Sequence, residues 1–143
     1  MIPKTPPVAG TVLRFGYLWK REAGTGRTEA NKDRPVALVV ASAAADGECV
    51  VVPITHTPPQ EPDTAIEIPP SQRAKIGLDD EPAWIVLNEF NRFFWPGYDL
   101  RPVPGRRPPT AIYGTISANL YKRVVTRLRV LLRERRTTGV PRT

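Results

Sequence analysis

Residues 32–40 read KDRPVALVV, and residues 50–56 read VVVPITH. These two Val-rich runs decide the fold, because β-branched residues favour extended strands. Asp46-Gly47 between them is a typical hairpin turn, so we predict that the two runs pair as antiparallel strands. The start of the first strand then lies beside the end of the second. Three polar residues are expected to meet at that end of the sheet: Arg34, Thr55 and His56.

These three side chains have the chemistry of a phosphodiester site. Arg34 can bind a phosphate with two parallel hydrogen bonds, and the Thr55 hydroxyl can donate another. The ordinary alternatives are a surface ion pair for Arg34 and a backbone hydrogen bond for Thr55. His56 is the only histidine, and its ordinary pKa suits acid–base catalysis. It alternates in direction with Thr55 if the strand continues, so it is either a catalytic group or a polar turn residue.

A polar, glycine-containing stretch at residues 20–33 precedes the first of these strands. Its composition predicts a long mobile loop, and such loops often cover a functional site. Within it, Glu29 is a candidate general base and Lys32 a candidate contact to the phosphodiester ligand. Each has the alternative of being a solvated loop charge.

The remaining pattern predicts a mainly β fold. The 143 residues with 17 prolines indicate one domain of short strands and long turns. A short helix is expected from Pro70 to about Ile76 with Gly77 as its cap. Ser117 is expected to cap a C-terminal amphipathic helix whose polar face is rich in Arg. We therefore predict a compact, mainly antiparallel β barrel with these two helices. Further strands are expected at 10–19, 65–68, 83–94 and 111–116, with an extended arm at 1–9, a single domain at 10–136 and a flexible tail at 137–143.

The net charge of +7 is unevenly distributed, with +4 over residues 1–45, −7 over 46–99 and +10 over 100–143. Basic ends suit an anionic partner such as nucleic acid or an acidic protein tail, although solvated charged faces are the ordinary alternative. No run approaches the roughly 20 apolar residues of a membrane span, the N-terminus lacks the apolar core of a signal peptide, and Cys49 has no partner for an internal disulfide. We therefore expect a cytoplasmic protein with no membrane partner.

Motifs for metal or nucleotide chemistry are missing from the sequence. One His and one Cys, seven residues apart, form no metal-ligand motif. No Gly-rich phosphate-binding loop of the nucleotide-hydrolase kind occurs either. No metal and no cofactor are therefore expected.

Several short motifs follow one another in an order that resembles one protein family. A strand opens with Gly10-Thr11-Val12-Leu13, Glu29 precedes Arg34-Pro35, and Val-rich strands lead to Pro53-Ile54-Thr55. A Gly-Leu step then precedes the next strand, and YGTIS at residues 113–117 precedes the apolar helix. Over about residues 10 to 133 the chain resembles the PemK/MazF toxins of bacterial toxin–antitoxin systems.

That resemblance implies an SH3-like barrel, a homodimer and a metal-independent endoribonuclease that cuts single-stranded RNA. It also implies a cognate antitoxin whose acidic segment blocks the site. The family's loop Glu, Arg and strand-end Thr match Glu29, Arg34 and Thr55.

The later central strand departs from the family pattern, because Asn88-Glu89 stands where relatives often carry Asp-Gln. A shift of one position places a side chain on the opposite face of a strand. Asn88, Asn91 and Trp95 are candidate RNA contacts, whereas the nearby aromatic residues have the alternative of core or dimer packing. The departure keeps a second interpretation open: a catalytically inactive barrel that binds RNA or an acidic protein segment, or that inhibits a protein target such as gyrase, as the related CcdB toxins do.

Overall fold

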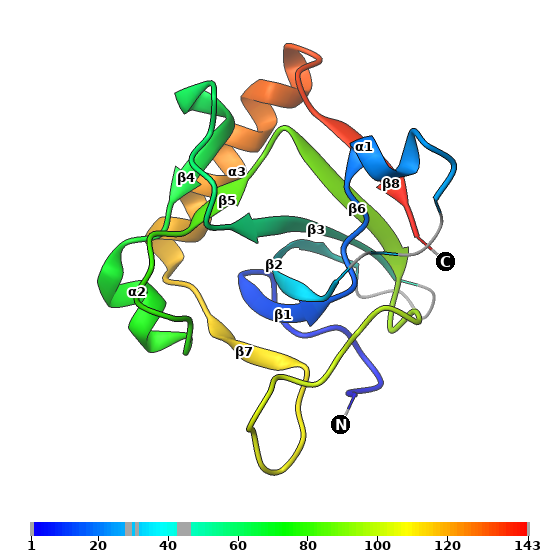
Figure 1. Cartoon of the computed structure of the whole chain (residues 1–143), viewed down its shortest axis with the longest axis vertical. Helices are drawn as coiled ribbons and strands as arrows, with labels where there is room; N and C mark the ends of the chain where they lie inside the picture. Colours follow the sequence, from blue (N-terminus) through cyan, green and yellow to red (C-terminus); the bar gives the residue numbers. More distant parts are fainter. Residues whose placement is uncertain (1, 28–29, 31, 43–46, 143) are drawn as a thin grey trace.

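The computed structural model describes residues 2–27, 30, 32–42 and 47–142. Within these ranges the protein is mainly β, with eight strands in one sheet and α3 as its long helix (Figure 1). In chain order the elements are β1 (Thr11–Phe15), α1 (Lys20–Ala23), β2 (Arg34–Ala41), β3 (Glu48–Thr55), the 3-10 turn η1 (Pro62–Thr64), β4 (Ala65–Glu67), α2 (Pro70–Lys75), β5 (Trp84–Val86), β6 (Glu89–Phe94), β7 (Ile112–Thr115), α3 (Ala118–Arg133) and β8 (Thr138–Pro141).

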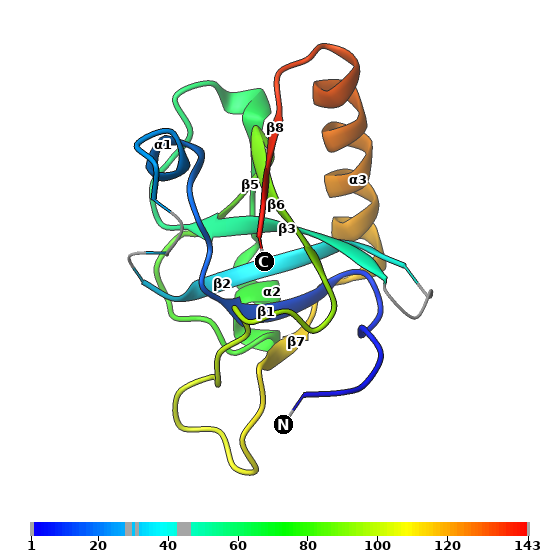
Figure 2. The same cartoon turned by 90° about the vertical axis from the view of Figure 1, so that its right-hand side faces the viewer.

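The sheet has the strand order β4-β5-β3-β2-β1-β7, and β6 also pairs with β3 and carries β8 on its other edge. All the pairs are antiparallel except β6 with β8. Figure 2 shows β1, β2 and β3 crossing the molecule while β6 and β8 rise steeply from them, so the sheet curls into a barrel-like shape with α3 along one side. The predicted mainly antiparallel β fold with a short helix and a C-terminal amphipathic helix is confirmed.

Both faces of the central strands are buried, which explains their continuous apolar sequence. Successive strand residues point to opposite faces, and Val12 and Leu13 accordingly belong to two different core clusters. The first cluster lies between the sheet and the helices. There α3 contributes Leu120, Val124, Leu128 and Leu131. The second cluster lies on the other face and includes Phe15, Tyr17, Cys49, Phe93 and Trp95.

Both predicted helix caps are confirmed. The Ser117 side chain accepts a hydrogen bond from the backbone N–H of Leu120 at 3.2 Å, which satisfies a donor that the first turn leaves free. Gly77 follows α2 in a left-handed conformation, with φ of +73°. The N–H groups of Gly77 and Leu78 donate to the carbonyls of Ala74 and Arg73, which is the Schellman pattern that favours glycine.

The predicted single strand over 83–94 is wrong, because the chain breaks into β5 and β6. Both pieces pair with β3, Ile85 opposite Ile54 and Asn91 opposite Val51. Pro53 lies between these two pairings and has no N–H to donate to a continuous ladder. At the break, Leu87 donates its N–H to the carbonyl of Thr64 instead.

Three further expectations need correction. The first strand ends at Phe15, and part of the predicted loop over 20–33 is the short helix α1. The predicted flexible tail over 137–143 contains β8, which pairs parallel with β6. The expected turn residue Asp46 lies outside the described residues.

Across the described part of the chain, no helix combines the length and apolar character of a membrane span.

Candidate functional site

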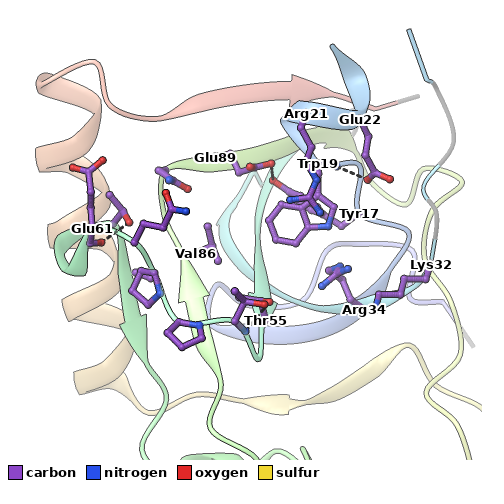
Figure 3. A pocket seen from close by; sticks show the side chains of 17 residues that line it. Tyr17, Trp19, Arg21, Glu22, Lys32, Arg34, Thr55, Glu61, Val86 and Glu89 are labelled. Carbon is purple, nitrogen blue, oxygen red and sulfur yellow. Dashed lines mark hydrogen bonds between the residues drawn. The ribbon is translucent and has the colours of Figure 1, made fainter. Parts of the chain in front are cut away.

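Arg34 and Thr55 come together at one end of the β2–β3 pair, as the sequence predicted. In this antiparallel pair Val36 lies opposite Pro53, and continuing the same register brings the first residue of β2 opposite the last residue of β3. Both side chains line a cavity of about 520 Å³ and an adjoining cavity of about 530 Å³. The cavity of about 520 Å³ is called the first cavity (Figure 3). The residues that line it include Tyr17, Trp19, Arg34, Thr55, Asn88 and Glu89. The second cavity has Arg14, Arg34, Thr55, His56, Arg106 and Tyr113 in its wall.

The Arg34 guanidinium is partly desolvated and has no anionic partner in contact with it among the residues that the structure describes. Its Cζ atom lies 4.8 Å from the ring centroid of Trp19, and its Nε is buried without a hydrogen-bond partner among the described residues. Burial lowers the pKa of Arg34, and the Glu22 carboxylate opposes that shift. No described carboxylate forms an ion pair with Arg34. A phosphate in the cavity would supply the counter-charge that the described residues lack.

Trp19 forms the centre of the first cavity's wall, a role that the sequence reading missed. Figure 3 shows Arg34 and Lys32 on one side of the cavity, Glu61 on the other, and Trp19 and Thr55 between them. The Trp19 ring packs edge-on against Tyr17 at 5.2 Å. Arg21 lies 5.3 Å from the ring centroid. A tryptophan directly before the charged sequence KRE was the available signal, because large aromatic residues at polar boundaries often face ligands.

Two carboxylates in the first cavity hold the start of α1 in place. Glu89 accepts hydrogen bonds from the Tyr17 hydroxyl at 3.0 Å and from the Lys20 N–H at 2.8 Å. Burial, with Glu89 as the next cause, raises the pKa of Tyr17, so the phenol stays protonated and donates. Glu22 accepts from the Trp19 N–H at 3.1 Å. These bonds fix the turn that presents Trp19 to the cavity.

The other predicted residues of this cavity have mixed outcomes. Lys32 is exposed and lines both cavities, and Asn88 is exposed and lines the first. Asn88 and Glu89 both line this cavity despite being neighbours in sequence. Glu29 lies outside the described residues.

His56 faces only the second cavity and is held among acidic groups. Its Nδ1 lies 2.8 Å from the Pro82 carbonyl, and its Nε2 lies 3.0 Å from Asp79 Oδ2 and 3.7 Å from Glu81. The Pro82 hydrogen bond, followed by these carboxylates, raises the pKa of His56. The arrangement therefore favours a proton donor over a base. His56, Asp79 and Glu81 could also jointly ligate a cation, since their ligand atoms lie within 4.8 Å of one another, but all three are exposed.

Asn91 and Trp95 are structural residues, so their prediction as RNA contacts is wrong. Asn91 is fully buried, and its amide exchanges two 2.9 Å hydrogen bonds with the N–H and carbonyl of Leu18. Trp95 is 8% exposed and donates its Nε1–H to the Pro3 carbonyl at 2.9 Å. The reason is the two-residue strand period: Asn91 and Phe93 on β6, and Trp95 just after it, point inward, whereas Arg92 and Phe94 point outward.

No protein-family model matches the chain, and no curated protein matches it significantly. The chemistry of the site therefore has to be inferred from its own residues.

Proposed function

We propose that the protein is a metal-independent endoribonuclease that cleaves single-stranded RNA, with Arg34 and Thr55 binding the phosphate that is cut. The observation that carries this proposal is the Arg34 guanidinium, which shares a cavity with Thr55 and lacks an anionic partner among the described residues. A wall with an aromatic ring beside a cationic groove is typical of single-strand binding. The resemblance to PemK/MazF toxins implies the same activity.

The reaction needs charge stabilisation and two proton transfers. In the transition state, Arg34 and the Thr55 hydroxyl donate hydrogen bonds to the phosphoryl oxygens. The 2′-oxygen bonds to phosphorus as the bond to the 5′-oxygen breaks, leaving a 2′,3′-cyclic phosphate and a 5′-hydroxyl. A base takes the 2′-hydroxyl proton, for which Glu29 is the candidate that the resemblance implies. An acid protonates the 5′-oxygen; protonated His56 beside Thr55 is the candidate, and it would have to release its Nε2–H from Asp79 to act.

The biological role that goes with this activity is a toxin-like one. Following the resemblance, the proposal includes a cytoplasmic homodimer, growth arrest through RNA cleavage, and neutralisation by an antitoxin with an acidic segment. The cationic residues that line both cavities, Lys32 and Arg34, would attract either RNA or such a segment.

A second candidate is a barrel that binds without cleaving. It is favoured by the hydrogen bonds and the ion pair that already engage the described carboxylates of the first cavity. Glu22 and Glu89 are engaged with backbone N–H groups, and Glu61 pairs with Arg136 at 3.1 Å. A base occupied in this way transfers protons poorly. Such a protein would hold RNA or an acidic protein segment, or inhibit a protein target as CcdB toxins do.

The deciding experiment incubates purified protein with a mixed-sequence single-stranded RNA in EDTA. We expect cleavage to fragments with 2′,3′-cyclic phosphate ends. Arg34→Ala should lower the rate by about 10²–10³-fold, the loss typical of a removed oxyanion donor, and Thr55→Val should lower it by a smaller factor. Arg92→Ala, which changes an exposed arginine on β6, should cleave at the wild-type rate.

Thermal melts of each variant separate lost chemistry from lost folding. Full activity of Arg34→Ala would overturn the proposal. Wild-type protein that binds the RNA but leaves it intact would favour the second candidate.

A further inference from the structure

The two cavities form one path across the Arg34–Thr55 pair. Four residues, Lys32, Arg34, Thr55 and Thr57, line both of them. A strand whose scissile phosphate sits on Arg34 and Thr55 therefore has room on either side, about 520 Å³ in one direction and about 530 Å³ in the other. Because the two cavities lie on different sides of the shared residues, the two sides can have different tasks.

The two sides differ in charge. The first cavity is balanced, with Arg21, Lys32 and Arg34 against Glu22, Glu61 and Glu89, and its wall contains the Trp19 ring. In the second cavity, cations outnumber carboxylates. Its two carboxylates already face other cations: Asp33 lies 3.6 Å from Arg101, and Asp79 lies 3.0 Å from His56. Among the described lining residues, the positive charge without a paired carboxylate belongs to Arg14, Lys32, Arg34 and Arg106.

Arg14 and Arg106 are held by the same residue, Tyr113 of β7. Arg14 donates its Nη1–H to the Tyr113 hydroxyl at 2.8 Å, and the Arg106 guanidinium lies 6.0 Å from the Tyr113 ring centroid. Arg106 also donates from Nη1 to the carbonyls of Ile112 and Tyr113, at 3.3 and 3.2 Å. Neither guanidinium forms an ion pair within the part of the chain that the structure describes. Two half-buried guanidiniums that pair with no described carboxylate can together bind an anion.

Local sequence brings Arg106 to this position. Val103 accepts a backbone hydrogen bond from Arg106, Pro104 follows Val103, and Gly105 has φ of +75°. Pro followed by a left-handed Gly is typical of a type II turn, and this turn directs the chain back towards β7. Gly77 leaves the space that the guanidinium occupies, because a Cβ there would lie 2.6 Å from Arg106 Nη2.

We propose that Arg14, Arg106 and Tyr113 form a second phosphate subsite, which binds the RNA phosphate next to the one held by Arg34 and Thr55. The inference rests on the proposed function and deepens it. The strand crosses from the first cavity, where Trp19 faces a base, to the second, where two guanidiniums bind the adjacent phosphodiester. The planar guanidinium forks match phosphate oxygens, whereas the second cavity offers no comparable tryptophan among its described lining residues.

The test measures binding separately from cleavage. The probe is a fluorescent, mixed-sequence 2′-O-methyl RNA decamer, which lacks the attacking hydroxyl, titrated at several salt concentrations. We expect Arg14→Ala and Arg106→Ala each to weaken binding roughly tenfold or more. Each should also lower the slope of log K against log salt by about 0.7, the value for one contact to a single strand. Arg107→Ala, an exposed neighbour in the same loop, is the matched control and should bind as the wild type does.

Two additions keep the result interpretable. Arg106→Lys retains the charge and should restore most of the salt slope, which a merely structural role for Arg106 would not predict. A polyglutamate peptide of equal charge is titrated separately; if its affinity depends on Arg14 and Arg106 while the affinity of the decamer does not, an acidic protein segment is the ligand of this subsite and the proposal is overturned.

The outcomes separate this inference from the proposed function. Wild-type cleavage of RNA together with unchanged affinity and slope in Arg14→Ala and Arg106→Ala would overturn the second subsite and leave the nuclease standing. Wild-type binding without cleavage, with both variants weakened, would support the subsite and overturn the nuclease. A wild-type protein with no affinity for the decamer would overturn both.

Discussion

Single polar residues in this molecule have roles that depend on what surrounds them. Arg34 and Asn91 are both polar residues on strands, yet Arg34 lines a cavity and its Nε has no partner in the described part of the chain, whereas Asn91 is enclosed and exchanges two hydrogen bonds with Leu18. Cys49 shows the same effect of surroundings, because burial raises the pKa of its thiol to about 11. A thiol with so little thiolate at neutral pH is a core residue and a poor nucleophile.

His56 should make stability depend on pH. Its pKa in the folded protein is raised, mainly by the hydrogen bond to Pro82 and then by Asp79 and Glu81. The imidazolium therefore stabilises the fold fully below the ordinary pKa of 6.5, and that stability is lost as pH rises through the folded-state value. Urea unfolding on both sides of this range should show the wild type losing stability relative to His56→Gln as pH rises. This assignment would be contradicted if the stability of the wild type relative to His56→Gln stayed constant or increased as pH rises.

At the scale of elements, local signals place the caps and tertiary contacts set the strand breaks. Ser117 begins α3, and Gly77 ends α2, with the backbone geometry that their sequences favour. The break between β5 and β6 has no strong turn motif of its own. It coincides with Pro53 of β3, which lies between the two pairings and has no N–H to donate to a neighbouring strand.

Gly77 links the end of α2 to the second cavity, so its substitution should affect both stability and binding. Gly77→Ala places a side chain at φ of +73°, which costs roughly 1–2 kcal/mol of unfolding free energy. The new Cβ would also push the Arg106 guanidinium aside and weaken binding of the RNA mimic.

A double-variant cycle separates these two effects. In an Arg106→Ala background, Gly77→Ala should still lower stability, measured by urea unfolding, but should cause no further loss of binding. An equal loss of binding in both backgrounds would show that Gly77 acts on the site by another route.

For the whole molecule, the C-terminal strand joins segments that are far apart in sequence. β8 pairs with β6, and beyond it Arg142 forms a 2.6 Å ion pair with Asp99, with side chains 4% and 8% exposed. Arg142 also donates to the carbonyl of Gly16 at 3.2 Å. These contacts tie the C-terminus to the segment that leads from β1 to Tyr17 and Trp19, so β8 supports the wall of the first cavity.

Removing this buried cation should be costly. Arg142→Ala leaves the Asp99 carboxylate buried without its cation partner, and breaking such a pair typically costs about 3–5 kcal/mol of unfolding free energy. The double variant Asp99→Leu/Arg142→Leu should recover much of that loss, because neither charge of the pair then remains buried. Arg135→Ala, at an exposed arginine, serves as control. A loss below about 0.5 kcal/mol in urea unfolding, the range of ordinary surface changes, would mean that β8 adds little to the fold.

Much of the site was readable from the sequence, because its main parts come from one hairpin. Two Val-rich runs joined by a short turn predict antiparallel pairing, and that pairing alone brings Arg34 beside Thr55. Helix caps and the apolar face of α3 were predictable for the same reason, since their signals lie within a few residues of one another. Local sequence thus determined the β2–β3 pair, the helix ends and the mainly β class.

Only the tertiary structure decided which partners meet across long separations. Nothing near Asn91 in sequence indicates that its amide bonds to Leu18, that Trp19 packs against Arg34, or that β8 pairs with β6 in parallel. These contacts depend on how the curled sheet closes around two cores. The strand period assigns each side chain to a face, but the energy of burial across the whole molecule decides which faces become core and which become cavity.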